Sequence, residues 1–333
     1  MTELILIGDA LEKLKEIDDG TVDCCVTSPP YFNLRDYGVD GQIGIEDTPE
    51  AYVSKLVSVF QDVKRALKDD GTLWVNIGDS YNGSGKAGKH PEYQNRHTEF
   101  GKPSVHKERF GLPTNIKGLK PKDLIGIPWL LAFALRADGW YLRSDIVWQK
   151  PNNMPSSVKD RCTSSHEYIF MLSKQSKYYY DADAIKEPCV NGDPTSPRGS
   201  RGTKTPNSGR RDKQGELGKQ TYTGFNDRYF SKPPLAHRNK RDVWTVTTKP
   251  YRGAHFATFP PDLIEPCILA GSREGGIVLD PFMGSGTTCM VAKKHGRGYV
   301  GIELNPAYVE LAKKRIYEGT KDGVQLSIDA LAV

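Results

Sequence analysis

The chain has 333 residues, of which 37% are hydrophobic, and a formal net charge of +5. This length allows one large α/β domain with an insertion, and the absence of any run of eighteen apolar residues excludes a membrane-spanning helix. The six cysteines are scattered without metal-site spacing, and the N-terminus lacks the pattern of a signal peptide. We therefore expect a reduced, cytoplasmic protein with no structural metal.

Hydrophobic spacing predicts alternating strands and helices. Short apolar runs rich in β-branched residues indicate strands, and apolar residues three and four positions apart indicate helices. The expected strands are Leu4–Gly8, Val22–Thr27, Thr72–Ile77, Tyr141–Trp148, Glu167–Leu172, Lys177–Asp181, Gly276–Leu279 and Gly298–Ile302. The expected helices are Ala10–Ile17, Pro49–Leu67 (closed by Asp70-Gly71), Pro121–Ala137, Pro261–Ala270, Thr287–His295 and Pro306–Glu318. This alternation predicts a mostly parallel sheet with helices on both faces.

Two segments lack this periodicity. Residues 78–120 are rich in Gly, Lys and His, so we expect a long mobile loop. Residues 186–241 contain 13 Lys and Arg against 5 Asp and Glu, whereas the rest of the chain holds 33 against 36. A basic surplus confined to one Gly-, Pro- and Ser-rich segment predicts a polyanion-binding insertion on a nearly neutral scaffold.

The stretch Val26-Thr27-Ser28-Pro29-Pro30-Tyr31 ends a strand that reads as buried. Two prolines cannot continue the hydrogen-bonded ladder, so they force a rigid loop at the carboxyl end of the strand. In an open α/β sheet, ligands bind at that edge. The loop would present the Ser28 hydroxyl, proline carbonyls and the Tyr31 ring to a planar ligand.

A second loop, Leu279-Asp280-Pro281-Phe282-Met283-Gly284-Ser285-Gly286-Thr287-Thr288, joins a predicted strand to a predicted helix. Gly284 and Gly286 allow a tight turn and close approach of a ligand, and Glu303 ends the next strand, where an acid can bind a ribose diol. Cys289 stands where the G-x-G-x-x-G fingerprint of dinucleotide-binding proteins has its third glycine. Asp280 would repel a pyrophosphate but suits an ammonium and a sulfonium, which favours S-adenosylmethionine.

Both loops resemble motifs of the DNA amino-methyltransferases, which methylate an exocyclic base nitrogen. The catalytic motif precedes the cofactor motif, an order similar to that of the family's beta group. The resemblance implies a circularly permuted, Rossmann-like methyltransferase sheet. It implies a catalytic half at 1–185, a target-recognition insertion at 186–245 and a cofactor-binding half at 246–333.

The resemblance also assigns candidate site residues. The catalytic ones are Ser28, Pro29, Pro30 and Tyr31. The candidates for binding S-adenosyl-L-methionine are Asp9, Ala10, Phe259, Asp280, Pro281, Phe282, Gly284, Gly286, Thr287, Glu303 and Asn305. Asp9 could instead cap the helix that follows it, and Phe259 could belong to a segment that simply precedes a helix with Pro261 in its first turn. The insertion itself matches no family pattern. Its charge, and not the resemblance, makes Arg198, Arg201, Lys204, Arg210, Arg211 and Lys213 the candidates for binding DNA phosphates, with a solvated loop as the alternative.

The expected reaction is direct methyl transfer to an amine that is a poor nucleophile, because its lone pair is delocalised into the base. The Ser28 hydroxyl and the Pro29 carbonyl offer acceptors for its two N–H groups, and Tyr31 can stack on a flipped base. Trp148 lies in a segment similar to the one that forms the wall of the flipped-base pocket in the family. It is equally plausible as a residue of the hydrophobic core.

Serine before the two prolines favours cytosine N4, and adenine N6 remains an alternative. The implied partner is double-stranded DNA, while a homodimer and a cognate restriction endonuclease stay open. A protein glutamine methyltransferase, which usually has Asn before the prolines, is a more remote alternative. A catalytically dead DNA-binding protein is disfavoured by the intact Ser28, Asp280 and Glu303.

Overall fold

A computed structural model describes residues 2–34, 39, 41–83, 116, 118–153, 155–189, 237–248 and 259–330. The chain divides into two compact units, one made of Met1–Ala184 with Arg241–Val333 and the other of Ile185–Lys240. Each is described by itself. Among the described residues, no helix is long and apolar enough to cross a membrane.

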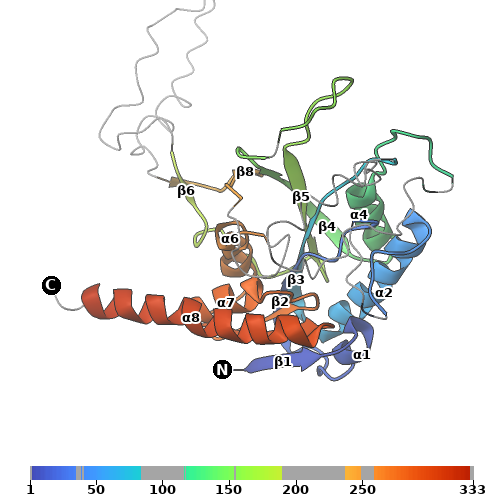
Figure 1. Cartoon of the computed structure of the whole chain (residues 1–333). Helices are drawn as coiled ribbons and strands as arrows, with labels where there is room; N and C mark the ends of the chain where they lie inside the picture. Colours follow the sequence, from blue (N-terminus) through green and yellow to red (C-terminus); the bar gives the residue numbers. More distant parts are fainter. Residues whose placement is uncertain are drawn as a thin grey trace, which may run out of the picture. The chain divides into compact units, whose positions relative to one another are not determined.

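An eight-stranded sheet forms the centre of the larger unit (Figure 1), in the order β1-β10-β9-β2-β3-β5-β4-β8. Its strands are β1 (Glu3–Ile7), β2 (Val22–Thr27), β3 (Leu67–Ile77), β4 (Tyr141–Gln149), β5 (His166–Ser173), β8 (Val243–Thr245), β9 (Ile277–Asp280) and β10 (Gly298–Glu303). Five neighbouring pairs are parallel, and only β5 runs antiparallel to its two neighbours. The predicted fold, a mostly parallel Rossmann-like sheet with helices, is confirmed.

Helices cover both faces of this sheet. One group contains α1 (Ala10–Leu14), α2 (Pro49–Ala66) and α4 (Ile127–Ala137), and the other contains α6 (Pro261–Gly271), α7 (Thr287–Lys294) and α8 (Pro306–Ala330). Within each group consecutive helices contact one another, and Figure 1 shows the two groups on opposite sides of the strands. The strand β2 is buried along its whole length between them.

The start of α2 shows how sequence sets a helix boundary. The Thr48 side chain accepts a hydrogen bond from the Ala51 amide, and Pro49 occupies the first turn, where its missing N–H costs nothing. Eight side chains on one face, from Pro49 to Ala66, are buried against the sheet and the neighbouring helices. Burying this apolar face is the main stabilising term for the helix.

Several predicted boundaries were wrong. The helix expected at Pro121–Ala137 begins only at Ile127, because the Asp79 carboxylate accepts hydrogen bonds from the Gly126 and Ile127 amides and caps it there. No strand forms at Lys177–Asp181; this segment runs irregularly, with its Tyr179 amide bonded to the Asp70 carbonyl.

The helix expected at Pro49–Leu67 ends at Ala66, one residue earlier, and β3 begins at Leu67, before the Asp70-Gly71 pair that was expected to close the helix. The register of β2 against β3 shifts between Val22 and Cys24, so residues 68–71 form an irregular part of β3 rather than a helix end. The first helix is three residues shorter than expected, and α8 is longer than the predicted Pro306–Glu318.

The sequence missed β8, and this changes the expected boundary of the insertion. β8 pairs in parallel with β4, so residues 241–245 belong to the larger unit and not to the insertion predicted at 186–245. In the smaller unit, β6 (Glu187–Pro188) pairs antiparallel with β7 (His237–Arg238), and the Arg238 Nε donates to the Glu187 Oε1 at 2.8 Å. Most of the loop expected at 78–120 lies outside the described residues.

Candidate active site

A pocket of about 150 Å³ opens at the carboxyl ends of β1, β2, β9 and β10. β2 and β9 are neighbours near the middle of the sheet. The strand that follows β2 in the chain, β3, lies on one side of this pair, and the strand that follows β9, β10, lies on the other. The pocket therefore lies where the strand order reverses. Ligands of open α/β sheets bind at this kind of position. The predicted site residues that line it are Asp9, Ala10, Ser28, Pro29, Pro30, Tyr31, Phe259, Asp280, Pro281, Phe282, Gly284, Thr287, Glu303 and Asn305.

The Ser28–Tyr31 loop is held from α2. The buried Tyr52 donates its hydroxyl to the Pro30 carbonyl at 2.8 Å, which fixes the loop at its centre. Within the described part of the chain, the Pro29 carbonyl accepts no hydrogen bond. The Pro29 oxygen is therefore free of a protein partner there. The acceptor roles of the Pro29 carbonyl and the Ser28 hydroxyl stay a prediction.

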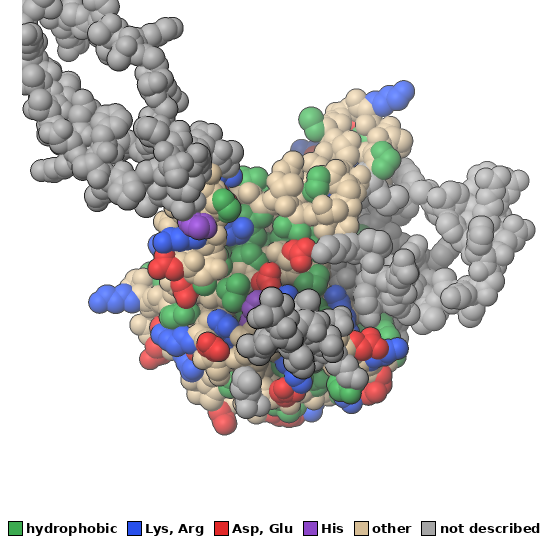
Figure 2. Space-filling model, turned by 90° about the vertical axis from the view of Figure 1, so that its left-hand side faces the viewer, with side chains coloured by type: hydrophobic (Ala, Val, Ile, Leu, Met, Phe, Trp, Pro, Cys, Tyr) green, Lys and Arg blue, Asp and Glu red, His purple; other side chains and the backbone are tan. Residues whose placement is uncertain are grey.

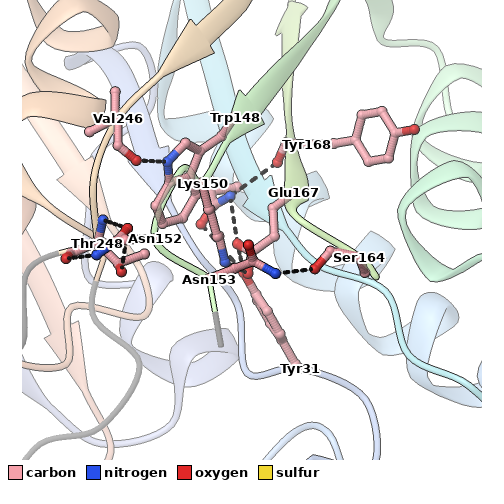
Figure 3. A network of polar contacts seen from close by, with 11 residues as sticks. Tyr31, Trp148, Lys150, Asn152, Asn153, Ser164, Glu167, Tyr168, Val246 and Thr248 are labelled. Atoms are coloured by element: carbon pink, nitrogen blue, oxygen red, sulfur yellow. Dashed lines mark hydrogen bonds and ion pairs between the residues drawn. The ribbon is translucent and has the colours of Figure 1, made fainter. Parts of the chain in front are cut away.

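Polar side chains from β3, β5 and the residue after β4 lie around Tyr31 (Figure 3). Its hydroxyl donates to the Glu167 Oε2 at 2.7 Å, and the Asn76 Nδ2 donates to the same oxygen at 3.3 Å. Lys150 forms an ion pair with the other oxygen of Glu167 and lies 4.2 Å from the centre of the Trp148 ring. Burial, followed by the nearby Glu167 charge, raises the pKa of Tyr31 well above its ordinary value, so the phenol stays protonated.

Trp148 belongs to the framework of this site. Its side chain is 3% exposed, and its Nε1 donates to the Val246 carbonyl at 2.8 Å, which ties β4 to the segment after β8. Asn152 continues this connection through hydrogen bonds with the backbone of Thr248 (Figure 3). These bonds anchor β4 and the residues after it to the returning chain.

Asp280 connects the two loops at the base of the pocket. It is 1% exposed, and its Oδ1 accepts from the Thr27 hydroxyl at 2.6 Å and from the Phe282 amide at 3.1 Å. Thr288 adds a second connection by donating to the Val26 carbonyl at 3.2 Å. Burial raises the pKa of Asp280 to about 6, against the opposing effect of these hydrogen bonds. A cation bound beside this carboxylate would restore its charged form.

Glu303 shapes the next part of the pocket. Its carboxylate accepts from the Gly284 amide at 2.9 Å and the Asn305 amide at 2.8 Å, and burial raises its pKa. Asp9 lines the pocket while its Oδ1 also caps α1 by accepting from the Glu12 amide, so the two predicted roles are compatible in one residue. Three carboxylates from β1, β9 and β10 thus face one pocket.

Gly286 is the one predicted cofactor residue that does not line this pocket. It precedes α7 with a φ of 75°, and a Cβ added there would lie 2.9 Å from the Cβ of Ala312 in α8. Glycine at this position permits close packing of two helices, in addition to the turn.

Replacing Gly286 with alanine should therefore lower the free energy of unfolding. Gly20→Ala is the matched control, because Gly20 also has a positive φ, of 66°, with nothing within 4 Å of an added Cβ. We expect Gly286→Ala to cost about 1 kcal/mol or more beyond Gly20→Ala in urea titrations, since it adds crowding to the backbone strain. Equal losses would show that packing against Ala312 is unimportant.

Sequence reasoning missed several residues of the site. Gln42, Ile43 and Tyr308 also line the pocket. Arg315 of α8 donates to the hydroxyls of Ser285 and Thr287, at 2.6 and 2.7 Å, and so fixes the Gly-rich loop. Glu167 offered one signal, as an acid in an otherwise mainly apolar strand. The others carried none, because their positions depend on tertiary packing.

The predicted DNA-binding residues Arg198, Arg201, Lys204, Arg210, Arg211 and Lys213 lie outside the described residues. On the face of the molecule in Figure 2, acidic and basic side chains are interspersed over the described part. This mixture agrees with the nearly balanced charge of the chain outside residues 186–241.

The strand order and the position of the pocket define an α/β fold of the methyltransferase type, and comparisons with known proteins agree. A family model described as DNA methylase matches residues 22–314. The type II methyltransferase M.Cfr9I of Citrobacter freundii is 48% identical over 309 residues, covering 93% of this chain and 86% of the relative. M.SmaI of Serratia marcescens is also 48% identical, covering 94% and 90%. The chain therefore belongs to the DNA methylase family, as an amino-methyltransferase of the N4/N6 type.

Solved structures agree on the fold. The PvuII DNA methyltransferase (cytosine-N4-specific) superposes with a TM-score of 0.57 at 18% identity, covering 96% of this chain and 92% of that one. A putative DNA modification methylase from Thermus thermophilus, complexed with S-adenosyl-L-methionine, has a TM-score of 0.54 at 24% identity, with 96% of both chains covered.

Proposed function

We propose that this protein is a type II DNA methyltransferase that transfers a methyl group from S-adenosyl-L-methionine to N4 of cytosine in double-stranded DNA. The observation that carries the proposal is a single pocket lined by both the Ser28–Tyr31 loop and the Asp280–Thr287 loop. A donor of a methyl group and an acceptor amine would meet there. Family membership and two 48% identical type II methyltransferases support this function.

The donor set of the pocket fits S-adenosyl-L-methionine. When bound, this cofactor supplies an electrophilic methyl group on a sulfonium. Asp280 attracts the positive charges, the Glu303 carboxylate accepts from the ribose hydroxyls, and Asp9 accepts from the adenine amine. Phe259 and Phe282 supply apolar surface. A glycine-rich loop with three carboxylates nearby would repel a dinucleotide pyrophosphate.

The catalytic loop acts on the amine. The Ser28 hydroxyl and the Pro29 carbonyl accept hydrogen bonds from the two N–H groups, which orients the nitrogen and stabilises positive charge as it develops. A base must leave the duplex to reach this pocket, and the Tyr31 ring then stacks on it. In direct transfer the amine nitrogen would gain the methyl group as the bond from that group to the cofactor sulfur breaks, and the displaced amine proton would pass to water. No covalent enzyme intermediate forms, and positioning is the main source of the rate enhancement.

Cytosine N4 is the proposed target because a neutral serine, not Asp or Asn, precedes the two prolines. Adenine N6 is the second candidate, since its amine has the same two donors. In nuclease digests of methylated DNA, N4-methylcytosine supports the first and N6-methyladenine would replace it.

Residues 186–241 supply the proposed DNA contacts. Their basic side chains neutralise phosphates, so DNA affinity should fall steeply as salt rises. We place the enzyme in the cytoplasm, in a restriction-modification system. Sedimentation of the protein tests whether it forms a homodimer. Digestion of DNA before and after methylation by this enzyme tests whether a cognate restriction endonuclease exists, because methylation should block its cleavage.

Transfer of labelled methyl groups tests the class of substrate. The protein is incubated with labelled cofactor and either genomic DNA of varied sequence or a mixture of glutamine-containing proteins. Label in DNA alone is expected. Label in protein, or no label in either sample, would contradict the proposal.

Cofactor binding should depend on pH through Asp280. The bound cation favours the ionised carboxylate, so affinity is full above the pKa of about 6 and falls as Asp280 becomes protonated below it. We expect the Kd to rise about tenfold for each pH unit below the pKa. Calorimetry between pH 7 and 5 measures this change, and a flat profile would exclude Asp280 as the carboxylate that senses the cofactor charge.

A further inference from the structure

Two buried hydroxyl groups of the Gly-rich loop, those of Ser285 and Thr287, belong to residues that line the pocket. The two residues are only 1% and 3% exposed. Nη1 of Arg315 donates to the Ser285 Oγ at 2.6 Å and to the Thr287 Oγ1 at 2.7 Å. Arg315 does not line the pocket itself, and it comes from α8, which packs against α7 (Figure 1).

Arg315 fixes the direction of both hydrogen bonds. A guanidinium has only donors, so each hydroxyl oxygen must act as the acceptor. Each hydroxyl then keeps its one proton, and within the part of the chain that the structure describes neither donates it to a protein group. A buried donor without an acceptor costs free energy. The two protons are therefore available to an acceptor that enters the pocket.

The charges of the pocket indicate which acceptor this is. At its amino-acid end, S-adenosyl-L-methionine carries an ammonium and a carboxylate on the same carbon. The carboxylates of Asp9, Asp280 and Glu303 attract the ammonium, but they repel the carboxylate. The carboxylate thus needs strong donors close to the partner of the ammonium. Ser285 and Thr287 meet this requirement, because they lie in the same loop as Asp280.

We propose that Arg315 is a positioning residue that makes the hydroxyls of Ser285 and Thr287 obligate donors, and so forms a subsite for the carboxylate of S-adenosyl-L-methionine. The inference rests on the placement of the cofactor in this pocket under the proposed function, and it holds for either target base. Arg315 acts through the two hydroxyls and does not itself touch the cofactor.

A ligand without the carboxylate tests this subsite. Decarboxylated S-adenosylmethionine keeps the sulfonium and the ammonium, so it differs from the cofactor only at the group in question. Calorimetry on the full chain should show that the wild-type protein binds the cofactor at least about tenfold more tightly than the decarboxylated ligand. Arg315→Met should raise the Kd for the cofactor about tenfold and leave the Kd for the decarboxylated ligand within about twofold.

A double-mutant cycle links Arg315 to the hydroxyls. Replacing both of them, with Ser285→Ala and Thr287→Val, should also weaken binding of the cofactor alone. Adding Arg315→Met to this variant should then raise the Kd by no more than about twofold, because the groups through which Arg315 acts are absent.

Arg143→Met is the matched control. The Nε of Arg143 donates to the Tyr178 hydroxyl at 3.0 Å, and neither residue lines the pocket. This variant should bind both ligands as the wild type does. Binding of the decarboxylated ligand also verifies that each variant is folded.

A loss that is selective for the cofactor, together with a non-additive cycle, supports the inference. Equal losses for the two ligands in Arg315→Met would show that Arg315 only supports the loop, and they would overturn the carboxylate subsite while leaving the proposed function standing. Additive losses, or equal affinities of the wild-type protein for the two ligands, would do the same. A wild-type protein that binds neither ligand would overturn the placement of the cofactor and this inference with it.

Discussion

Ser28→Ala is expected to lower kcat for DNA methylation by about 10²- to 10³-fold, because it removes an acceptor aimed at developing positive charge. The loop itself should keep its shape, since the Tyr52 hydroxyl still holds the Pro30 carbonyl and both prolines remain. Cofactor affinity should therefore stay within about twofold of wild type, because no cofactor contact is proposed for Ser28. Steady-state kinetics and calorimetry measure the two quantities.

Ser58→Ala is the matched control for this change. Ser58 lies on α2, where its hydroxyl donates to the carbonyl of Ser54 in the preceding turn, and it does not line the pocket. Its loss should leave kcat at the wild-type value. Unchanged turnover in Ser28→Ala would remove Ser28 from catalysis, and a parallel loss of cofactor binding would point to a collapsed loop.

Asp280→Asn should weaken binding of S-adenosyl-L-methionine by about 30-fold or more, corresponding to about 2 kcal/mol for a buried charge that loses its partner. The amide retains an oxygen for the Thr27 hydroxyl and the Phe282 amide, so the fold should be preserved. The substitution also removes the carboxylate whose pKa lies near 6, and most of the pH dependence of binding between pH 7 and 5 should disappear.

Asp18→Asn serves as the control, because Asp18 is an exposed carboxylate in the turn after α1, away from the pocket. Calorimetry of both variants at about pH 7.5, where the Asp280 carboxyl with its pKa of about 6 is ionised in the wild-type protein, gives the comparison. Equal affinities for the two would contradict the proposed contact between Asp280 and the cofactor charge.

The sequence could predict those parts of the site that are defined by residues adjacent in the chain. The prolines after Thr27 end β2, and Gly284 begins the turn before α7, so both loops could be placed at strand ends from the sequence. The parallel alternation then brought the two strand ends to the same edge of the sheet. β2 and β9 are direct neighbours, which accounts for the shared pocket.

Contacts made across the sheet were not predictable. Glu167 reaches Tyr31 over a separation of 136 residues, and nothing near either residue encodes that distance. The three-residue β8 is too short to show a period, and it forms by pairing with β4. The start of α4 depends on Asp79, a capping group 48 residues from Ile127.

The nucleoside product tests the central claim most directly. DNA of varied sequence is methylated with a cofactor whose methyl group is isotopically labelled, then digested completely and analysed by mass spectrometry. The account predicts the label on N4-methyldeoxycytidine, produced by the wild-type enzyme and nearly absent with Ser28→Ala. Label on N6-methyldeoxyadenosine would contradict the choice of cytosine, and label on a ring carbon such as C5 of cytosine, or no labelled nucleoside, would contradict the account as a whole.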